Sequence, residues 1–280
     1  MNNIFSPQTI AVVGASKTQG KVGHDIFQNI LYGGYTGTLY PVNPNASSVL
    51  SVKAFPSISA IPDQIDLAIL IVPPDAALQV SREAVERKVK AMVIVSAGFR
   101  EVGREGANIE KEIVDICVKA GIRIVGPNCL GIINTDPKVR LNASFARHMP
   151  DNGKIAFISQ SGALCTAVLD FAAGRNIGFS KFVSTGNKSD VDEICLLKYL
   201  HEDPETEVIL MYIEELKRAQ EFIQIAKEIT GGHKPTPILA IKSGRTEAGA
   251  KAASSHTGSI AGTEAVYDAI FQQSGIVRAS

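Results

Sequence analysis

The sequence has no tryptophan, few aromatic residues of any kind (6%) and no excess of either charge, because 28 basic residues balance 28 acidic ones. A chain without net charge has no general electrostatic attraction for nucleic acid or for an anionic membrane surface, so any phosphate group must be recognised locally. Hydrophobic residues still make up 45% of the 280 positions. That is enough apolar material for two aliphatic cores, which favours two domains.

Cysteine is also scarce, and the four cysteines, at positions 117, 129, 165 and 195, form no C-x-x-C pair. This pattern favours reduced thiols in a cytoplasmic protein and argues against a disulfide framework or a metal site. The N-terminal segment MNNIFSPQTI lacks the basic and apolar regions of a signal peptide. The longest apolar run, near residues 67–72, is far too short to span a bilayer, so we expect no membrane partner.

Short β-branched segments alternate along the chain with amphipathic segments of helical length. The strand segments are continuously hydrophobic, which is typical of parallel strands buried on both faces. Their alternation with helices favours right-handed crossovers and doubly wound sheets, and hence an α/β fold. The predicted strands are Thr9–Val13, Thr38–Val42, Asp66–Val72, Ala91–Ser96, Ile122–Val125, Lys154–Ser159, Phe179–Ser184, Glu207–Ile213 and Pro237–Lys242, and the predicted helices are Val22–Leu31, Asp75–Arg87, Glu105–Ala120, Gly162–Ala173, Val191–His201, Ala219–Ile229 and Thr263–Ser274.

The stretch Gly126–Gly153 interrupts this alternation, because it is rich in proline and glycine and has little periodicity. We therefore expect the domain boundary there, with one domain over residues 1–126 and a second over residues 127–280. The predicted strands divide between them as about five and four.

The first strand runs into a glycine-rich turn, Gly14 to Gly23, and then into a helix. Glycine lets a ligand approach the backbone, and the helix N-terminus offers unpaired N–H groups to an anion. The spacing is neither G-x-G-x-x-G nor that of a P-loop. The second strand ends in LYPVNPN, without the acidic residue that an NAD site expects, so NAD is disfavoured and another phosphate-bearing nucleotide is favoured. A turn that merely reverses the chain remains the alternative.

Two further strand ends carry small or rigid residues. The third strand ends in Val72-Pro73, and the fourth ends in Ser96-Ala97-Gly98. Ligands of open parallel sheets bind at the carboxyl ends of the strands, so these segments would line the same crevice as Gly14. Each signal is weak alone, because proline and glycine also simply end strands.

His256 differs from the other four histidines in its surroundings. Fifteen of the twenty residues from 243 to 262 are Gly, Ala, Ser or Thr, and they follow a predicted strand. A loop longer than about 12–15 residues in a compact domain is usually functional or disordered. An imidazole with a reference pKa near 6.5 is largely neutral at pH 7 and can act as nucleophile or base. A catalytic histidine and a flexible surface loop are both open.

Three other elements could converge on this histidine. Ser161 and Gly162 stand at a predicted helix N-terminus, where N–H groups would bind phosphate, although an ordinary serine N-cap is the alternative. Glu214 follows the strand that ends at Ile213 and could orient an imidazole, or be a solvated acid. The segment GPNCLG, with Asn128, could form a wall of the site. Cys129 as a nucleophile is less favoured, because no histidine partner is identifiable.

Taken together, these segments resemble the α-type portion of the nucleoside-diphosphate-forming acyl-CoA synthetases, the superfamily of succinyl-CoA synthetase, and most closely its ADP-forming acetate–CoA ligase branch. The resemblance covers residues 10 to about 262. The segments that carry it are VVGASKTQGKVGHDIFQNIL, LYPVNPN, IVPPDAA, VSAGFREVG, IVGPNCLGIIN, ISQSGALCTAVLD, STGNKSDVDEICLLKYL, YIEEL and SSHTGSIAG.

The resemblance implies a Rossmann-like CoA-binding domain followed by a flavodoxin-like ligase domain, both with parallel sheets. It implies that His256 is phosphorylated and that Glu214 steadies it. It also implies a phosphate site and a CoA site. The residues that match the phosphate site are Ser161, Gly162 and Asn128, and those that match the CoA site are Gly14, Ser16, Lys17, Thr18, Gln19, Val72, Pro73, Ser96, Ala97 and Gly98.

The activity that the resemblance implies is the interconversion of acyl-CoA, ADP and phosphate with a carboxylic acid, CoA and ATP. The family uses an ATP-grasp domain or subunit that binds ATP, ADP and magnesium, so we expect such a partner in a hetero-oligomer. A non-catalytic CoA-sensing or partner-binding module is the alternative. Two positions depart from the family pattern: Glu215 replaces a frequent glycine, and Thr166 falls near a position that is aromatic in succinyl-type members. Because the family usually continues beyond a strand like that near Gly275–Val277, we expect a shortened chain.

Overall fold

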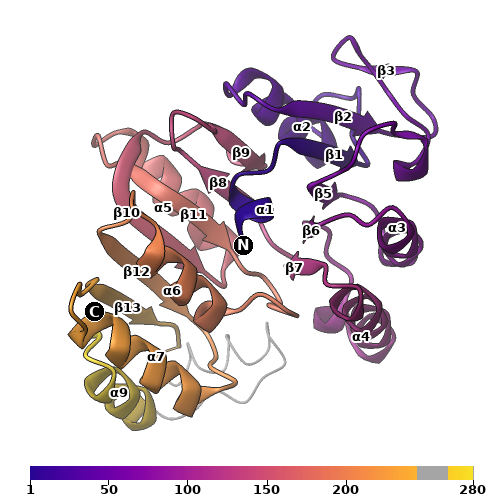
Figure 1. Ribbon diagram of the computed structural model, residues 1–280. Coiled ribbons are helices and arrows are strands. Elements are labelled where there is room, and N and C mark those ends of the chain that lie inside the picture. Colours follow the sequence, from indigo (N-terminus) through magenta and orange to yellow (C-terminus); the bar gives the residue numbers. More distant parts are fainter. Residues whose placement is uncertain (245–263, 280) are drawn as a thin grey trace.

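The structure is a computed structural model that describes residues 1–244 and 264–279. It contains two α/β units, each built around its own sheet (Figure 1). No helix in the described part of the chain is both long and apolar enough to cross a membrane.

The first unit is built on a five-stranded parallel sheet with the order β2-β1-β5-β6-β7. The inner strands β5 and β6 are wholly apolar and buried, because both faces of the sheet are covered: Ile10 and Val12 of β1 join one core cluster, and Ala11 and Val13 join another. Its elements are α1 (Asn2–Phe5), β1 (Thr9–Val13), α2 (Val22–Tyr32), β2 (Thr38–Val42), the hairpin β3 (Ser48–Val49) and β4 (Val52–Lys53), β5 (Leu67–Leu70), α3 (Pro74–Glu86), β6 (Ala91–Ile94), α4 (Arg104–Lys119) and β7 (Arg123–Val125), with short 3-10 turns at Ile58–Ala60 and Arg100–Val102.

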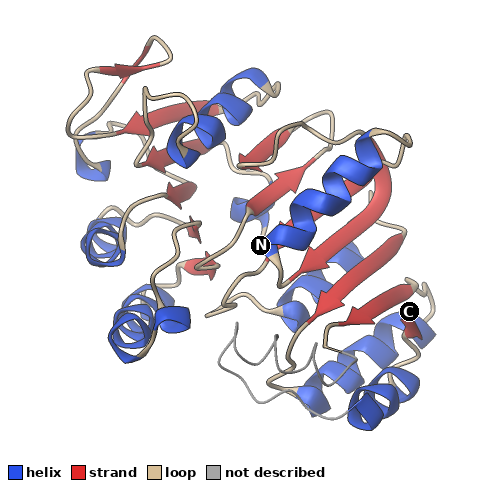
Figure 2. Ribbon diagram, turned by 180° about the vertical axis from the view of Figure 1, so that it is seen from behind, coloured by secondary structure: helices blue, strands red, loops and turns tan. Residues whose placement is uncertain are grey.

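The second unit is built on a seven-stranded sheet with the order β14-β13-β12-β10-β11-β8-β9. Helix α5 packs on one face and helices α6, α7 and α9 pack on the other, as Figure 2 shows from behind. The elements are β8 (Gly131–Asn134), β9 (Leu141–Ser144), β10 (Asn152–Ser159), α5 (Gly162–Ala173), β11 (Phe179–Ser184), α6 (Glu193–Glu202), β12 (Val208–Ile213), α7 (Ala219–Gly231), β13 (Ile238–Lys242), α9 (Glu264–Gln273) and β14 (Val277–Arg278).

The α/β class and the order of the two units are as the sequence predicts, with one correction to the second sheet. Strands β8 and β9 are antiparallel to their neighbours, so this sheet is mixed rather than wholly parallel. Both strands lie in the proline- and glycine-rich stretch that lacks periodicity. The sequence pattern did not reveal them because each strand is only four residues long and fully buried, so there is no alternation of apolar and polar positions to detect.

The two units share a continuous apolar interior. One core cluster contains Ile10 and Phe27 of the first unit together with Ile158 and Ile209 of the second. Helix α1 contributes to this seam, because the ring of Phe5 stacks on Tyr199 of α6 with centroids 4.9 Å apart. The seam brings the carboxyl ends of the first sheet against the second unit.

Candidate functional site

A cavity of about 470 Å³ lies where the first sheet meets the second unit. Ser96 and Ala97, which follow β6, line it from the first unit, and Asn128 lines it from the connection between the units. Ser161 and Gly162 line it from the start of α5. The structure therefore brings these five predicted site residues to one cavity, at strand ends where parallel sheets bind ligands.

The turn after β1 is held tightly against this cavity by two glycines. Gly14 has a φ of 91°, and a Cβ atom there would lie 2.3 Å from the carbonyl oxygen of Ile71. A Cβ atom on Gly23 would lie 2.0 Å from the carbonyl oxygen of Gly14. The absence of both side chains lets the first turn of α2 pack directly on the strand end, and Val22, at the start of that helix, lines the cavity together with Ile71.

Residues 17–19 form the exposed part of the same turn and do not line the cavity. The hydroxyl of Ser16 accepts a hydrogen bond of 3.1 Å from the backbone N–H of Thr18. From the end of β2, the side-chain amide of Asn43 donates to the carbonyl of Ala15 at 2.7 Å. Asn43, which stands where an NAD site expects an acidic residue, thus fixes the shape of the turn after β1.

The remaining predicted CoA residues, Val72, Pro73 and Gly98, adjoin in sequence the lining residues Ile71 and Ala97. Val72 and Pro73 stand between β5 and α3, and Pro73 is exposed. Gly98 has a φ of 104°, and its N–H donates to the carboxylate of Glu101 at 2.6 Å. None of the three lines the cavity, although the neighbouring Ile71 does.

Ser161 caps the helix that starts at the cavity. Its hydroxyl accepts a hydrogen bond of 3.3 Å from the N–H of Leu164, so for the side chain the N-cap interpretation is correct. The N–H of Ser161 itself donates to the hydroxyl of Ser159 at 3.0 Å. Gly162 and Ala163 line the cavity at the positive end of the helix dipole, a position that favours an anion.

Glu214 is tied to this turn through the side chain of Gln160. The Oε1 atom of Gln160 accepts from the N–H groups of Glu214 and Glu215, at 2.8 and 2.9 Å, and its Nε2 atom donates to the carbonyl of Glu215 at 2.9 Å. Glu214 lines a smaller cavity of about 30 Å³ with Gln160 and Asn128, which also line the larger one. The two cavities therefore meet at these two residues.

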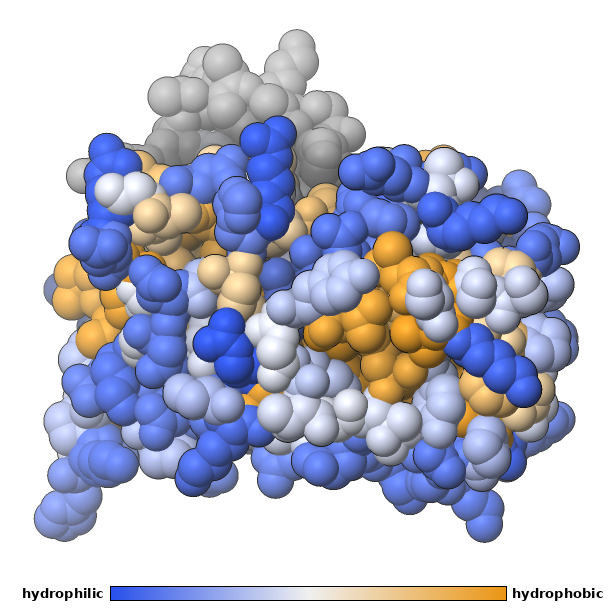
Figure 3. Space-filling view, turned by 90° about the horizontal axis from the view of Figure 1, so that it is seen from above, coloured by the Kyte–Doolittle hydropathy of each residue, from blue (hydrophilic) through white to orange (hydrophobic). Residues whose placement is uncertain are grey.

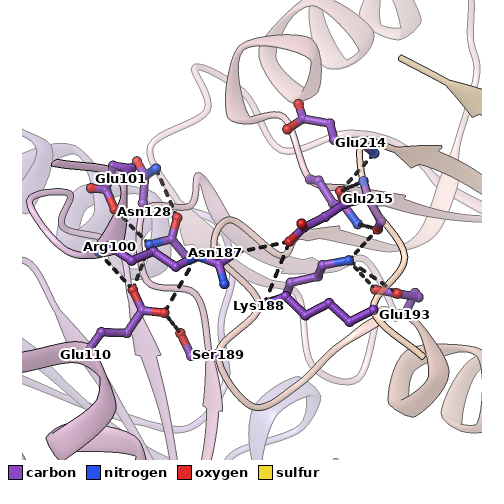
Figure 4. Close-up of polar contacts among 12 residues, drawn as sticks. Arg100, Glu101, Glu110, Asn128, Asn187, Lys188, Ser189, Glu193, Glu214 and Glu215 are labelled. Atoms are coloured by element: carbon purple, nitrogen blue, oxygen red, sulfur yellow. Dashed lines mark hydrogen bonds and ion pairs between the residues drawn. The ribbon is translucent and has the colours of Figure 1, made fainter. Parts of the chain in front are cut away.

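A buried ion pair supports the same segment from below (Figure 4). The ammonium group of Lys188 lies 3.1 Å from the carboxylate of Glu193 and donates to the carbonyl of Glu215 at 2.6 Å. Both charged side chains are buried, and burial raises the pKa of Glu193 even though Lys188 opposes the shift. Lys188 thus holds the backbone next to Glu214 in place.

Sequence reasoning missed Gln160, Lys188 and Arg100 as site residues. All three lie inside segments that carry the family resemblance, ISQSG, STGNKSD and VSAGFREVG, beside a strand end. That position was the only available signal, because the partners of these side chains are distant in the sequence.

His256 lies outside the described residues. Cys129 is a poor nucleophile, because burial raises the pKa of its thiol to about 12 and its sulfur donates to the carbonyl of Ile94 at 3.3 Å. Within residues 1–244 and 264–279, no group of three or more His, Cys, Asp and Glu side chains could hold a metal ion.

The chain matches two family models in sequence order. Residues 8–135 match a CoA binding domain, and residues 152–280 match a succinyl-CoA ligase like flavodoxin domain. The sequence is 44% identical, over its whole length, to the alpha subunit of acetate–CoA ligase [ADP-forming] II of Pyrococcus furiosus. It is also 44% identical, over 98% of its length, to 4-hydroxybutyrate–CoA ligase [ADP-forming] of Nitrosopumilus maritimus.

A solved structure has a similar fold over the entire chain. It is the dinucleotide forming acetyl-coenzyme A synthetase 1 of Ca. Korarchaeum cryptofilum in complex with phosphate and ADP, with a TM-score of 0.93 and 42% identity. The present chain covers 59% of that protein, 60% of the Pyrococcus subunit and 39% of the Nitrosopumilus ligase. Each of these proteins is therefore considerably longer than this chain.

Proposed function

The chain belongs to the family of NDP-forming acyl-CoA synthetases, as an alpha-type portion, and we propose that it carries the CoA site and the phosphorylated histidine of an ADP-forming acid–CoA ligase. The observation that carries the proposal is the cavity of about 470 Å³ at the junction of the units. Residues from the CoA-binding domain, Ser96 and Ala97, face the helix N-terminus at Ser161 and Gly162 across it.

The proposed reaction has three reversible steps. Phosphate attacks the thioester of acyl-CoA, which releases CoA and forms an acyl phosphate. His256 then takes the phosphoryl group and the carboxylic acid leaves. Finally the phosphoryl group passes from His256 to ADP, which forms ATP and restores the imidazole.

Each group of residues has a role that follows from its position. The helix N-terminus at Ser161 and Gly162, with Asn128, would hold the phosphate, because aligned amide dipoles stabilise charge that develops during transfer. Glu214 would accept a hydrogen bond from the imidazole of His256 and offset its positive charge. The turn from Gly14 to Gln19 and the residues Val72, Pro73 and Gly98 would hold CoA, which supplies the thiol.

The proposal also includes a partner protein or domain and a boundary between the two domains of this chain. An ATP-grasp domain or subunit would bind ADP, ATP and magnesium, and the complete enzyme would be a cytoplasmic hetero-oligomer. We place the boundary between the CoA-binding and ligase domains at residues 126 and 127. The acyl group would derive from a small carboxylic acid. The alternative of a non-catalytic sensor is not favoured, since the relatives with 44% identity are named as ligases.

Labelling with radioactive phosphate tests the role of His256. The chain, combined with its ATP-grasp partner, is incubated with labelled ATP and magnesium, and protein-bound label is measured. We expect acid-labile label in the wild type and none in His256→Ala. Calorimetry with CoA on the same variant provides the control, because its CoA site is intact. Full labelling of His256→Ala would refute the proposal.

A further inference from the structure

Arg100 connects the two units through Glu215, the residue that follows the acid Glu214 (Figure 4). Its guanidinium lies 3.3 Å from the carboxylate of Glu215, which comes from the other unit, 115 positions away in the sequence. On its own side, Arg100 lies 3.9 Å from the carboxylate of Glu110 and donates its backbone N–H to the same group at 3.2 Å. The arginine therefore spans a carboxylate of each unit.

The anchor of Arg100 on the first unit is rigid. Glu110 of α4 is buried, and it accepts hydrogen bonds from Asn187 at 2.9 Å and Ser189 at 2.7 Å. Asn187 also donates to Glu101 at 2.8 Å. The Glu110 carboxylate beside Arg100 is thus oriented by two donors, Asn187 and Ser189.

Arg100 belongs to the segment that would sense CoA. It lies two residues after Gly98 and four after Ser96, which lines the large cavity. Glu101 holds this segment by accepting from the N–H groups of Gly98 and Phe99, at 2.6 and 3.1 Å. A ligand that moves residues 96–98 would therefore move Arg100.

The far end of the connection is the backbone of Glu214. The carboxylate of Glu215 receives Arg100, while the backbone of Glu215 is held by Gln160 and Lys188. A displacement of Arg100 would pull on a peptide whose preceding residue is Glu214. Lys217 lies 3.8 Å from the same carboxylate, so Glu215 would keep a cationic neighbour if Arg100 were removed.

We infer that Arg100 is a positioning residue that couples the occupancy of the CoA crevice to the orientation of Glu214, acting through Glu215. The inference rests on the proposed function, since it assigns Glu214 to the phosphoryl site. It explains why a glutamate follows Glu214 here: its carboxylate reaches the other unit, which a glycine could not do.

Phosphorylation of His256 from two directions tests the coupling, using the chain together with its ATP-grasp partner. Label enters from labelled phosphate with acetyl-CoA, which needs the CoA crevice, or from labelled ATP with magnesium, which does not. Because small misplacements of a reacting group cost up to 10²-fold in rate, we expect Arg100→Gln to slow labelling from acetyl-CoA about tenfold. Labelling from ATP should stay within about twofold of the wild type, which also shows that the variant is folded.

Three further variants complete the experiment. Arg100→Lys keeps the charge and should recover part of the rate from acetyl-CoA. The double variant Arg100→Gln and Glu215→Gln should be labelled from acetyl-CoA no more slowly than the slower single variant, because both substitutions break the same ion pair. Arg82→Gln breaks an exposed ion pair with Glu112 in the same unit and serves as the control.

The possible outcomes separate this inference from the proposed function. An unchanged rate from acetyl-CoA in Arg100→Gln would overturn the coupling, and so would an equal loss in both directions, which indicates a role in the fold alone. Absence of label on His256 in the wild type from either direction would instead refute the proposed function.

Discussion

The side-chain oxygen of Gln160 accepts the backbone N–H of Glu214 at 2.8 Å, so the residue before the N-cap of α5 fixes the backbone of Glu214. Gln160 makes three hydrogen bonds to the Glu214–Glu215 peptides, which a shorter side chain cannot replace. Removal of the Gln160 side chain therefore tests whether it fixes the backbone of Glu214.

Replacement of Gln160 by alanine should destabilise the chain by about 1–3 kcal/mol, because it leaves partly buried amide groups without acceptors. It should also lower the rate of His256 phosphorylation from acetyl-CoA and phosphate. Urea denaturation and protein-bound label measure the two effects. Gln224→Ala, which removes only an exposed contact with Glu228, is the matched control. Equal stability of both variants would contradict the prediction.

Two glycines of the first turn, Gly14 and Gly20, differ in what surrounds them. A Cβ atom at Gly14 would lie 2.3 Å from a backbone oxygen, whereas one at Gly20 would meet nothing within 4 Å, although both residues have a positive φ. We expect Gly20→Ala to cost about 1 kcal/mol, because only the backbone conformation is strained, and Gly14→Ala to cost more. Denaturation gives the stabilities, and calorimetry with CoA should show weaker binding for Gly14→Ala. Similar stabilities of the two variants would refute this steric explanation.

The buried pair of Lys188 and Glu193 predicts an asymmetric response to mutation. Lys188→Met leaves a buried carboxylate without its cation and should cost about 3–5 kcal/mol. The double change Lys188→Met and Glu193→Leu removes both charges and should recover much of that loss, measured by urea denaturation. Lys154→Met breaks an exposed pair with Glu205, which water screens, and should cost far less than Lys188→Met. A double variant no more stable than Lys188→Met would contradict the prediction.

Glu101 predicts how stability depends on pH. Burial alone would raise the pKa of Glu101, but hydrogen bonds from Asn187 and from the amides of Gly98 and Phe99 outweigh it, so the pKa is lowered. A lowered pKa in the folded state contributes stability that is complete above the unfolded value, near 4.5, and disappears as pH falls through the folded value. The advantage of the wild type over Glu101→Gln should therefore be largest at neutral pH.

Urea denaturation of both proteins at pH 7, 5 and 3.5 measures this difference. The difference in the free energy of unfolding between the two proteins should be largest at pH 7 and smaller at pH 3.5, where the carboxylate of the unfolded chain is already mostly protonated. Glu86→Gln, at an exposed position in α3, provides the comparison for a general charge effect. A difference that stays constant over this range would show that the ionisation of Glu101 does not stabilise the fold.

Local patterns predicted the strands of the first sheet well, because each is a short and largely apolar run. Predicted and observed ends differ by one or two residues: β5 is Leu67–Leu70 where Asp66–Val72 was expected. Strands β8 and β9 were missed because β8 is held by pairing with β11 and β9 by pairing with β8, contacts that short segments such as Leu141–Ser144 do not encode locally.

The same distinction applies to the site. Strand ends and helix starts predicted five of the residues that line the large cavity, since parallel sheets place their carboxyl ends together. The residues that orient them were not predicted. Arg100 meets Glu215 across 115 positions and Asn187 meets Glu110 across 77, and no spacing rule connects such pairs.

The stacking of Phe5 on Tyr199 and the apolar cluster common to both units bury apolar side chains of each half against the other. If residues 1–126 or 127–280 were produced alone, each fragment would expose these apolar side chains to water. We expect such a fragment to aggregate rather than behave as a separate domain. The halves are thus better regarded as one folding unit with two sheets than as modules that evolution or an experimenter could exchange freely.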